Sequence, residues 1–318
     1  MAIAATEWAA VLDREYLAQF IGAGGATSKI AVSAPGTGAR AALPLETAAI
    51  ERGFVVARVS AAQTRVQMID QIFFAVARQI DWDGLCRRWL LGQFEANGYS
   101  VAPDADLSDL SVLATESGLT RPDLMGQAQR WIVNGILRDT RLDKEFRTAM
   151  AMLCQAALNP GNVSPADAEV LHKWLRGERF SLSALKRLQI FSKIGRHNAR
   201  RILSSLALWL HINGDASLVL SLDASALWDD GPREGEGAAL RYTRAAVLDF
   251  YEVLRQFIDE ADQTENFLLL VTATEGFWTH PKKGVDQYTA LKMRVADEVR
   301  DRTRANPLNA AVRIEVAA

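Results

Sequence analysis

A short apolar strand that runs into a glycine-containing turn and then a helix constrains this fold more than any other stretch. From Lys29 to Leu43 it reads Lys-Ile-Ala-Val-Ser-Ala-Pro-Gly-Thr-Gly-Ala-Arg-Ala-Ala-Leu. Gly36 and Gly38 let the backbone turn sharply between the strand and the helix. A unit of this kind begins many parallel sheets, because the helix carries the chain back to start the next strand.

The turn has the outline of a phosphate-binding loop but lacks its charged and hydroxyl groups. Such loops read Gly-x-x-x-x-Gly-Lys-Ser/Thr: backbone N–H groups cradle phosphates, the lysine holds the β- and γ-phosphates, and the hydroxyl ligates magnesium. Aligning the second glycine with Gly38 puts Ser33 at the first glycine. Ala39 and Arg40 then stand at the lysine and hydroxyl positions. The sequence predicts the shape of a nucleotide site without its chemistry; an ordinary glycine-rich turn is the alternative.

Four later stretches have the composition of buried strands. They are nearly continuous apolar runs, which is typical of parallel strands covered on both faces. With the strand at residues 30–32, they lie at residues 54–59, 218–223, 267–274 and 311–316. Apolar residues at helical spacing predict helices over residues 7–21, 40–52, 66–80, 82–94, 123–138, 142–157, 166–176, 197–212, 240–258 and 288 to about 304. This pattern predicts an α/β fold with a five-stranded parallel sheet.

The middle of the chain is poor in strand patterns and is expected to form a large helical insertion. We expect residues 1–80 to hold an N-terminal helix and the first half of a P-loop-like core, 81–196 the insertion, and 197–318 the second half of the core. Residues 97–122 are rich in turn-forming residues and predict an exposed loop within the insertion.

Polar residues end two of the predicted strands. Asp223 closes one, as does the aspartate that holds magnesium in P-loop ATPases, but Ala224 follows where active enzymes carry a glutamate base. Thr272 and Thr274 close another, at the strand end where open α/β sheets gather ligand-contacting groups. The candidate, degenerate nucleotide site therefore consists of Gly36, Thr37, Gly38, Arg40, Asp223, Thr272 and Thr274.

A basic stretch is the second candidate site. Its cations are Lys186, Arg187, Lys193, Arg196, Arg200 and Arg201. The net charge of the chain is −2, so contact with DNA would have to come from such a local surface. The alternative is a solvated helix face with no binding role.

Other chemistry finds little support in the sequence. Cys86 and Cys154 stand alone, and the four histidines show no metal-ligand spacing: His172, His197, His211 and His280. We therefore predict no metal site and no catalytic residues. The N-terminus lacks the basic and apolar regions of a signal peptide, and no apolar run is long enough to cross a membrane. This predicts a cytoplasmic protein without membrane contact.

Several motifs, taken in their order along the chain, carry a family resemblance. They are the glycine loop, Glu51–Val59, Trp174–Glu178, Leu218–Asp223, Thr272–Thr274, Pro281–Arg294, Asn306-Pro307 and Val312–Ile314. From about residue 24 onward the chain resembles the ATP-binding proteins of BREX-type bacteriophage-defence systems, a P-loop family of the AAA type. The resemblance implies an AAA-type P-loop fold, ATP and magnesium as the family's ligands, and partners within a defence complex.

The chain departs from the family at the positions that handle ATP. Ala39 and Arg40 replace the loop lysine and its Ser/Thr neighbour, and Asp223-Ala224 replaces an acidic pair. Family members also tend to continue into helices that resemble an AAA lid, and this sequence shows no evident C-terminal lid before Ala318.

These departures favour a catalytically inactive P-loop subunit with no required cofactor, ATP and magnesium being bound only if the loop still holds them. Its expected role is assembly or regulation within a hetero-oligomeric anti-phage or DNA-processing complex. One alternative is an active ATPase in which Arg40 supplies the missing charge. Another is an adaptor that binds DNA through the basic stretch.

Overall fold

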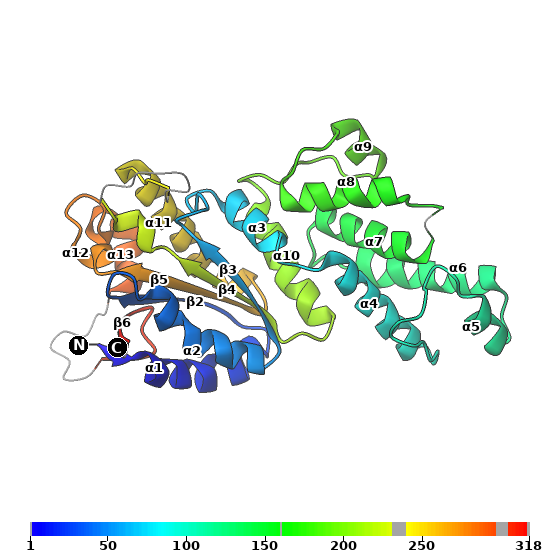
Figure 1. Cartoon of the computed structure of the whole chain (residues 1–318), viewed down its shortest axis with the longest axis horizontal. Coiled ribbons are helices and arrows are strands. Elements are labelled where there is room, and N and C mark those ends of the chain that lie inside the picture. The colour runs from blue at the N-terminus through cyan, green and yellow to red at the C-terminus, as the bar shows by residue number, and fades with distance from the viewer. Residues whose placement is uncertain (1, 160, 231–239, 297–304, 317–318) are drawn as a thin grey trace. The chain divides into compact units, whose positions relative to one another are not determined.

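The chain folds into two compact units (Figure 1). The computed structural model describes residues 2–159, 161–230, 240–296 and 305–316. The sheet unit comprises Met1–Val76 and Asp215–Ala318, and the helical unit comprises Ala77–Gly214. The helix at residues 199–212, which the sequence boundaries put with the core, groups with the helical unit.

The sheet unit is built on a single all-parallel sheet in the order β1-β6-β2-β5-β4-β3. The strands are β1 (Ile3–Ala4), β2 (Ala26–Ser33), β3 (Phe54–Ser60), β4 (Ser217–Asp223), β5 (Phe267–Thr274) and β6 (Ala311–Glu315). The α/β class is confirmed, but the predicted count of five strands is wrong. The sixth strand, β1, has two residues, too few for any periodic pattern, and pairs with β6 through Ile3 and Ile314.

Helices cover both faces of this sheet, as its apolar strands require. The helices of the sheet unit are α1 (Ala5–Leu12), η1 (Asp13–Ile21), α2 (Gly38–Glu51), α3 (Ile69–Ala77, crossing into the helical unit), η3 (Ser225–Trp228), α11 (Arg244–Asp259), η4 (Ala261–Gln263), α12 (Gly276–Thr279), η5 (Val285–Gln287) and α13 (Thr289–Val295). Figure 1 shows α1 and α2 on one side of the sheet and α11 on the other. Trp8, Leu12 and Leu45 are fully buried in the core beneath α1 and α2; each such leucine stabilises the fold by roughly 2 kcal/mol. The part of the predicted last helix at residues 297–304 lies outside the described residues.

The first predicted helix changes its winding halfway. The sequence spacing places Tyr16 and Phe20 on its apolar face, but from Asp13 onward the turn is π-helical. The wider π-helical turn rotates later side chains around the axis. Leu17 and Ile21 are therefore buried, while Phe20 is 47% exposed.

The helical unit contains no strand among its described residues. Its helices are α4 (Trp82–Ala96), α5 (Ser111–Glu116), α6 (Arg121–Ile132), η2 (Val133–Leu137), α7 (Lys144–Leu158), α8 (Pro165–Arg176), α9 (Leu182–Arg187) and α10 (Ala199–Ile212). The predicted loop at 97–122 contains the short helix α5. Buried aromatic pairs hold the core; Trp89, for example, stacks on Trp209 with ring centroids 6.0 Å apart.

The ends of α8 follow the signals in its sequence. Ser164 and Asp167 form a reciprocal capping box, with Pro165 at the first helical position. Gly177, at φ 71°, adopts the left-handed conformation that ends the helix. In neither unit does any described helix combine the length and apolarity that a bilayer span requires.

Candidate functional site

The sheet order brings the glycine turn and Asp223 to the same edge. Strand β5 lies between β2 and β4, so the carboxyl ends of all three strands meet there. A Cβ atom built on Gly38 would lie 3.1 Å from Thr272 Oγ1, 3.2 Å from Ser225 Oγ and 3.4 Å from Asp223 Oδ1. The structure thus brings Gly38 of the turn beside Asp223 and Thr272.

The turn itself is closed by internal hydrogen bonds. Thr37 donates its backbone N–H (3.1 Å) and its hydroxyl (2.7 Å) to the carbonyl of Ala34. Pro35 in second place and Gly36 at φ 75° match a type II β-turn. A phosphate-binding loop must point its N–H groups at the ligand. The backbone N–H of Thr37 instead points back into the turn, toward the carbonyl of Ala34.

Asp223 is held by neighbouring protein groups. Its Oδ1 accepts from the backbone N–H of Ser225 at 3.0 Å and from the hydroxyl of Thr272 at 3.3 Å. Ala224, where a catalytic glutamate would stand, is fully buried. The carboxylate is therefore oriented, but no acidic neighbour follows it to activate a water molecule.

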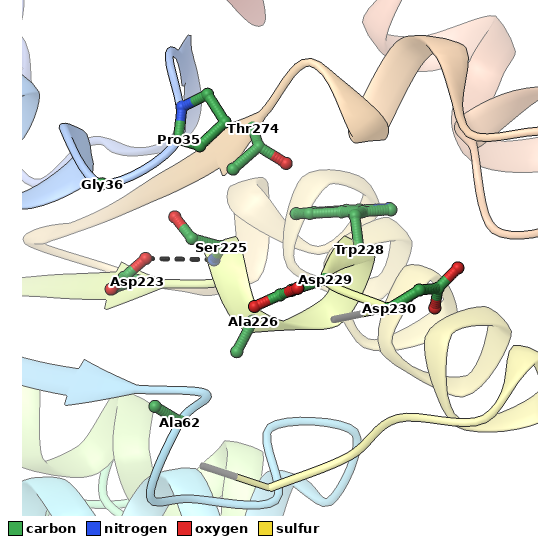
Figure 2. A pocket seen from close by; sticks show the side chains of 10 residues that line it. All are labelled: Pro35, Gly36, Ala62, Asp223, Ser225, Ala226, Trp228, Asp229, Asp230 and Thr274. Carbon is green, nitrogen blue, oxygen red and sulfur yellow. Dashed lines mark hydrogen bonds between the residues drawn. The ribbon is translucent and has the colours of Figure 1, made fainter. Parts of the chain in front are cut away.

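A cavity of about 370 Å³ opens over this edge of the sheet (Figure 2). Its lining residues are Pro35, Gly36, Ala62, Asp223, Ser225, Ala226, Trp228, Asp229, Asp230 and Thr274. Among the described residues that line it, three are aspartates and none is Lys or Arg. The described lining therefore offers no cationic side chain that could hold a phosphate group.

A second cavity, of about 540 Å³, follows α2 toward β3. It is lined by Ala39, Arg40, Ala42, Leu43, Glu46, Arg58, Val59, Ser60, Gln63, Ser221, Asp223 and Thr272. Glu46, of which 5% is exposed, accepts a 2.7 Å hydrogen bond from Arg58 Nε, so these two charges neutralise each other. Arg40 thus lines the cavity beside α2 and is not among the residues of the cavity over Gly36.

The segment after Asp223 is fastened by the loop that carries the Pro-Lys-Lys-Gly motif. The carbonyl of Lys283 accepts hydrogen bonds from Trp228 Nε1 (3.1 Å) and the Tyr251 hydroxyl (2.6 Å). Lys283 Nζ in turn donates to Asp230 at 2.6 Å, and His280 Nε2 lies 2.9 Å from the same carboxylate. These two contacts lower the pKa of Asp230 to about 2. The motif therefore has a positional role that its sequence did not reveal.

The glycine of this motif is required by packing. A Cβ on Gly284 would lie 2.7 Å from the backbone oxygen of His280, which cannot move aside as a side chain could. We expect Gly284→Ala to destabilise the protein by about 2 kcal/mol in urea unfolding. Gly92→Ala is the matched control: a Cβ built on this helical glycine has open space around it, so the substitution should stabilise the protein by roughly 0.5–1 kcal/mol. Equal effects of the two substitutions would contradict this role.

The structure also reveals a buried lysine that the sequence analysis did not single out. Lys29 on β2 is 3% exposed; it donates to the Tyr16 hydroxyl at 2.9 Å and to the Leu308 carbonyl at 2.6 Å. Its amine lies 4.3 Å from the centre of the Tyr16 ring. Burial lowers the pKa of Lys29 to about 8. The available signal was a lysine directly before the apolar run predicted as a strand at residues 30–32.

The predicted basic stretch lies wholly in the helical unit, on α9, on α10 and in the loop between them. Arg187 lies 3.8 Å from Asp167 and Arg201 lies 3.6 Å from Asp143. Among the described residues, three of the exposed cations form no ion pair: Lys186, Lys193 and Arg196. The stretch is thus only partly neutralised by neighbouring acids.

Comparison with known proteins places the chain in a family. Residues 114–316, most of the chain, match the family model described as BREX system ATP-binding protein BrxC/D. The glycine turn at residues 33–40 lies outside the matched range. Neither a search of curated proteins nor one of solved structures gives a significant match. The resemblance seen in the sequence is confirmed, and the chain belongs to the family of BREX system ATP-binding proteins.

Proposed function

We propose that this chain is a catalytically inactive subunit of a BREX phage-defence system, which keeps the sheet of a P-loop ATPase and acts as an assembly or regulatory module. Membership of the family supports the role in phage defence. The observation that carries the inactivity is the turn at Ala34–Thr37, which is closed on itself and is followed by Ala39 and Arg40. We place the protein in the cytoplasm, within a hetero-oligomer of defence proteins.

The loop lysine and the catalytic base, both missing here, lower the free energy of the transition state for ATP hydrolysis in P-loop enzymes. A P-loop enzyme stabilises the transferred phosphoryl group with a lysine and magnesium and orients water with a base. Loss of one such group typically costs roughly 3 kcal/mol of transition-state stabilisation. Here Ala39 and Ala224 remove the cation and the base together.

Rescue by Arg40 is the alternative, and the geometry disfavours it. Arg40 occupies the position of the hydroxyl that ligates magnesium, where a second cation is repelled. It lines the cavity beside α2, whereas Gly36 and Thr274 line the other. Asp223 lines both cavities, so the arginine shares one cavity with the carboxylate that would hold magnesium.

Titration calorimetry with ATP and magnesium tests the proposal. We expect no heat of binding at concentrations up to about 1 mM, because only backbone N–H groups and the start of α2 remain to hold phosphate. A dissociation constant in the low micromolar range would contradict the proposal and would point to Arg40 as the phosphate-binding cation.

A second candidate function is contact with nucleic acid through the basic stretch. Its support is that Lys186, Lys193 and Arg196 are exposed and form no ion pair among the described residues. Cations that protein carboxylates leave unneutralised are available to phosphates.

Charge reversal tests this contact. Replacing Arg196, Arg200 and Arg201 with Glu should abolish DNA binding in a gel-shift assay. The salt dependence of binding should be lost with it, because it arises from the counterions that cation–phosphate contacts release from DNA. Arg130→Glu with Arg138→Glu, at exposed positions of the same unit, is the control and should retain binding. Unchanged affinity in the triple variant would show that the stretch is only a solvated surface.

A further inference from the structure

An exposed aromatic ring lies in the middle of the basic stretch. Phe191, in the loop at residues 188–198 between α9 and α10, is 56% exposed. Its neighbours Ile190 and Ile194 are buried, whereas Lys193 is exposed like Phe191. The loop therefore turns two apolar side chains inward and holds an aromatic side chain and a cation outward.

The exposure of Phe191 does not come from a loose loop. Glu145 accepts hydrogen bonds from the backbone N–H of Phe191 at 3.3 Å and from the hydroxyl of Ser192 at 3.1 Å. The buried indole of Trp174 donates to the carbonyl of Ser192 at 2.9 Å. A carboxylate and an indole thus fix the backbone on both sides of the residue. The Phe191 ring is therefore exposed to solvent although its backbone is anchored, and it lacks the burial that stabilises most phenylalanine side chains.

The cations that follow Phe191 lie on an equally well-defined turn. Asn198 accepts from the backbone N–H of Gly195 at 2.8 Å and donates to the carbonyl of Lys193 at 3.2 Å. This closes the turn that carries Lys193 and Arg196, both exposed and without an ion pair among the described residues. Arg200 and Arg201 follow in the first turn of α10, where cations oppose the helix dipole, and Arg201 lies 3.6 Å from Asp143.

We propose that the loop at residues 188–198 is a binding platform for single-stranded nucleic acid, in which an unpaired base stacks on Phe191 and the neighbouring phosphates contact Lys193 and Arg196. The reason is chemical: every base has a face that can stack on an aromatic ring, and a duplex hides those faces inside its helix. Cations alone would serve duplex and single strand alike. This inference rests on the proposed nucleic-acid contact and adds the form of nucleic acid that is bound.

Fluorescence anisotropy tests the platform. The probes are a labelled oligothymidylate of about 16 nucleotides and a duplex of equal length. We expect tighter binding of the single strand and about a 10-fold loss of its affinity in Phe191→Ala, the effect of one stacked base, with duplex binding unchanged. Phe191→Tyr should retain the affinity, because the ring is kept. Phe20→Ala, at an exposed phenylalanine in the sheet unit, is the matched control and should have no effect.

The outcomes separate this inference from the function on which it rests. If Phe191→Ala binds the single strand as the wild type does, while reversal of Lys193 and Arg196 to Glu abolishes binding, the platform is wrong and the contact through the cations stands. If the wild type binds neither probe, the proposed contact itself fails. Unaltered circular dichroism of each variant shows that the fold is retained, so that a loss of affinity is a loss of contacts.

Discussion

The variant Ala39→Lys, Arg40→Thr, Ala224→Glu is expected to bind ATP with magnesium at least 100-fold more tightly than the wild type, with negligible turnover. The introduced lysine would supply a cation near the phosphates, and the introduced threonine would replace the charge that repels magnesium with a ligand for it, beside Asp223. Turnover should remain negligible, because catalysis requires groups held to within about 0.5 Å by their surroundings. The closed turn and the buried site of Ala224 provide no such support.

Calorimetry measures the affinity for ATP, and a phosphate-release assay measures turnover. Adding Asp223→Ala to the rebuilt variant is the control and should remove the gained affinity, since magnesium would lose its carboxylate. If the unmodified protein releases phosphate from ATP and Asp223→Ala abolishes this release, the proposed inactivity is wrong.

The free energy of unfolding of the wild type should rise by about 2 kcal/mol, relative to Lys29→Met, between about pH 7 and pH 9.5. The pKa of Lys29 is about 8 in the folded chain, below its ordinary value of 10.5. Between these two values the unfolded state binds more protons than the folded state, so stability increases with pH. Below pH 8 the fold carries a buried charge, which destabilises it.

Chemical denaturation of both proteins across this range measures the effect. The comparison cancels groups that titrate in both chains, and burial raises the pKa of Tyr16 so that it stays protonated in the window. Lys282→Met, at an exposed lysine of the same unit, is the control and should follow the wild type. A constant difference between wild type and Lys29→Met would show that the pKa of Lys29 is the same in the folded and unfolded states, so that burial does not lower it.

The sequence predicted the sheet and the meeting of its functional parts because both follow from local patterns. Continuous apolar runs located five strands, and the carboxyl ends of parallel strands must share an edge. This was enough to bring Gly38 beside Asp223. Strand β1 was not predicted because its two residues form no pattern. The π-helical winding after Asp13 was not predicted because it changes the helical period on which the prediction depended.

The chemistry of the site was only partly readable. The loss of the loop lysine and of the catalytic base can be read directly from the sequence, at Ala39 and Ala224. The hydrogen bonds that close the turn onto Ala34 depend on backbone geometry, which the sequence does not show. Lys29 donates to the carbonyl of Leu308, 279 residues away, and the loop residue Phe191 is anchored by Glu145 on α7. Such contacts join side chains to distant backbone groups and leave no periodic trace in the sequence.

The strand order has a consequence for synthesis of the chain on the ribosome. Strand β2 emerges early, yet Ala26 pairs with Phe267 and Ile30 pairs with Ala311. Both edges of β2 therefore stay unpaired until its two partners, β5 (Phe267–Thr274) and β6 (Ala311–Glu315), have been translated. Pairings this distant in sequence are slow to form and expose strands to aggregation. We expect the sheet to close only after translation, which makes this chain a candidate client of chaperones that shield exposed strands.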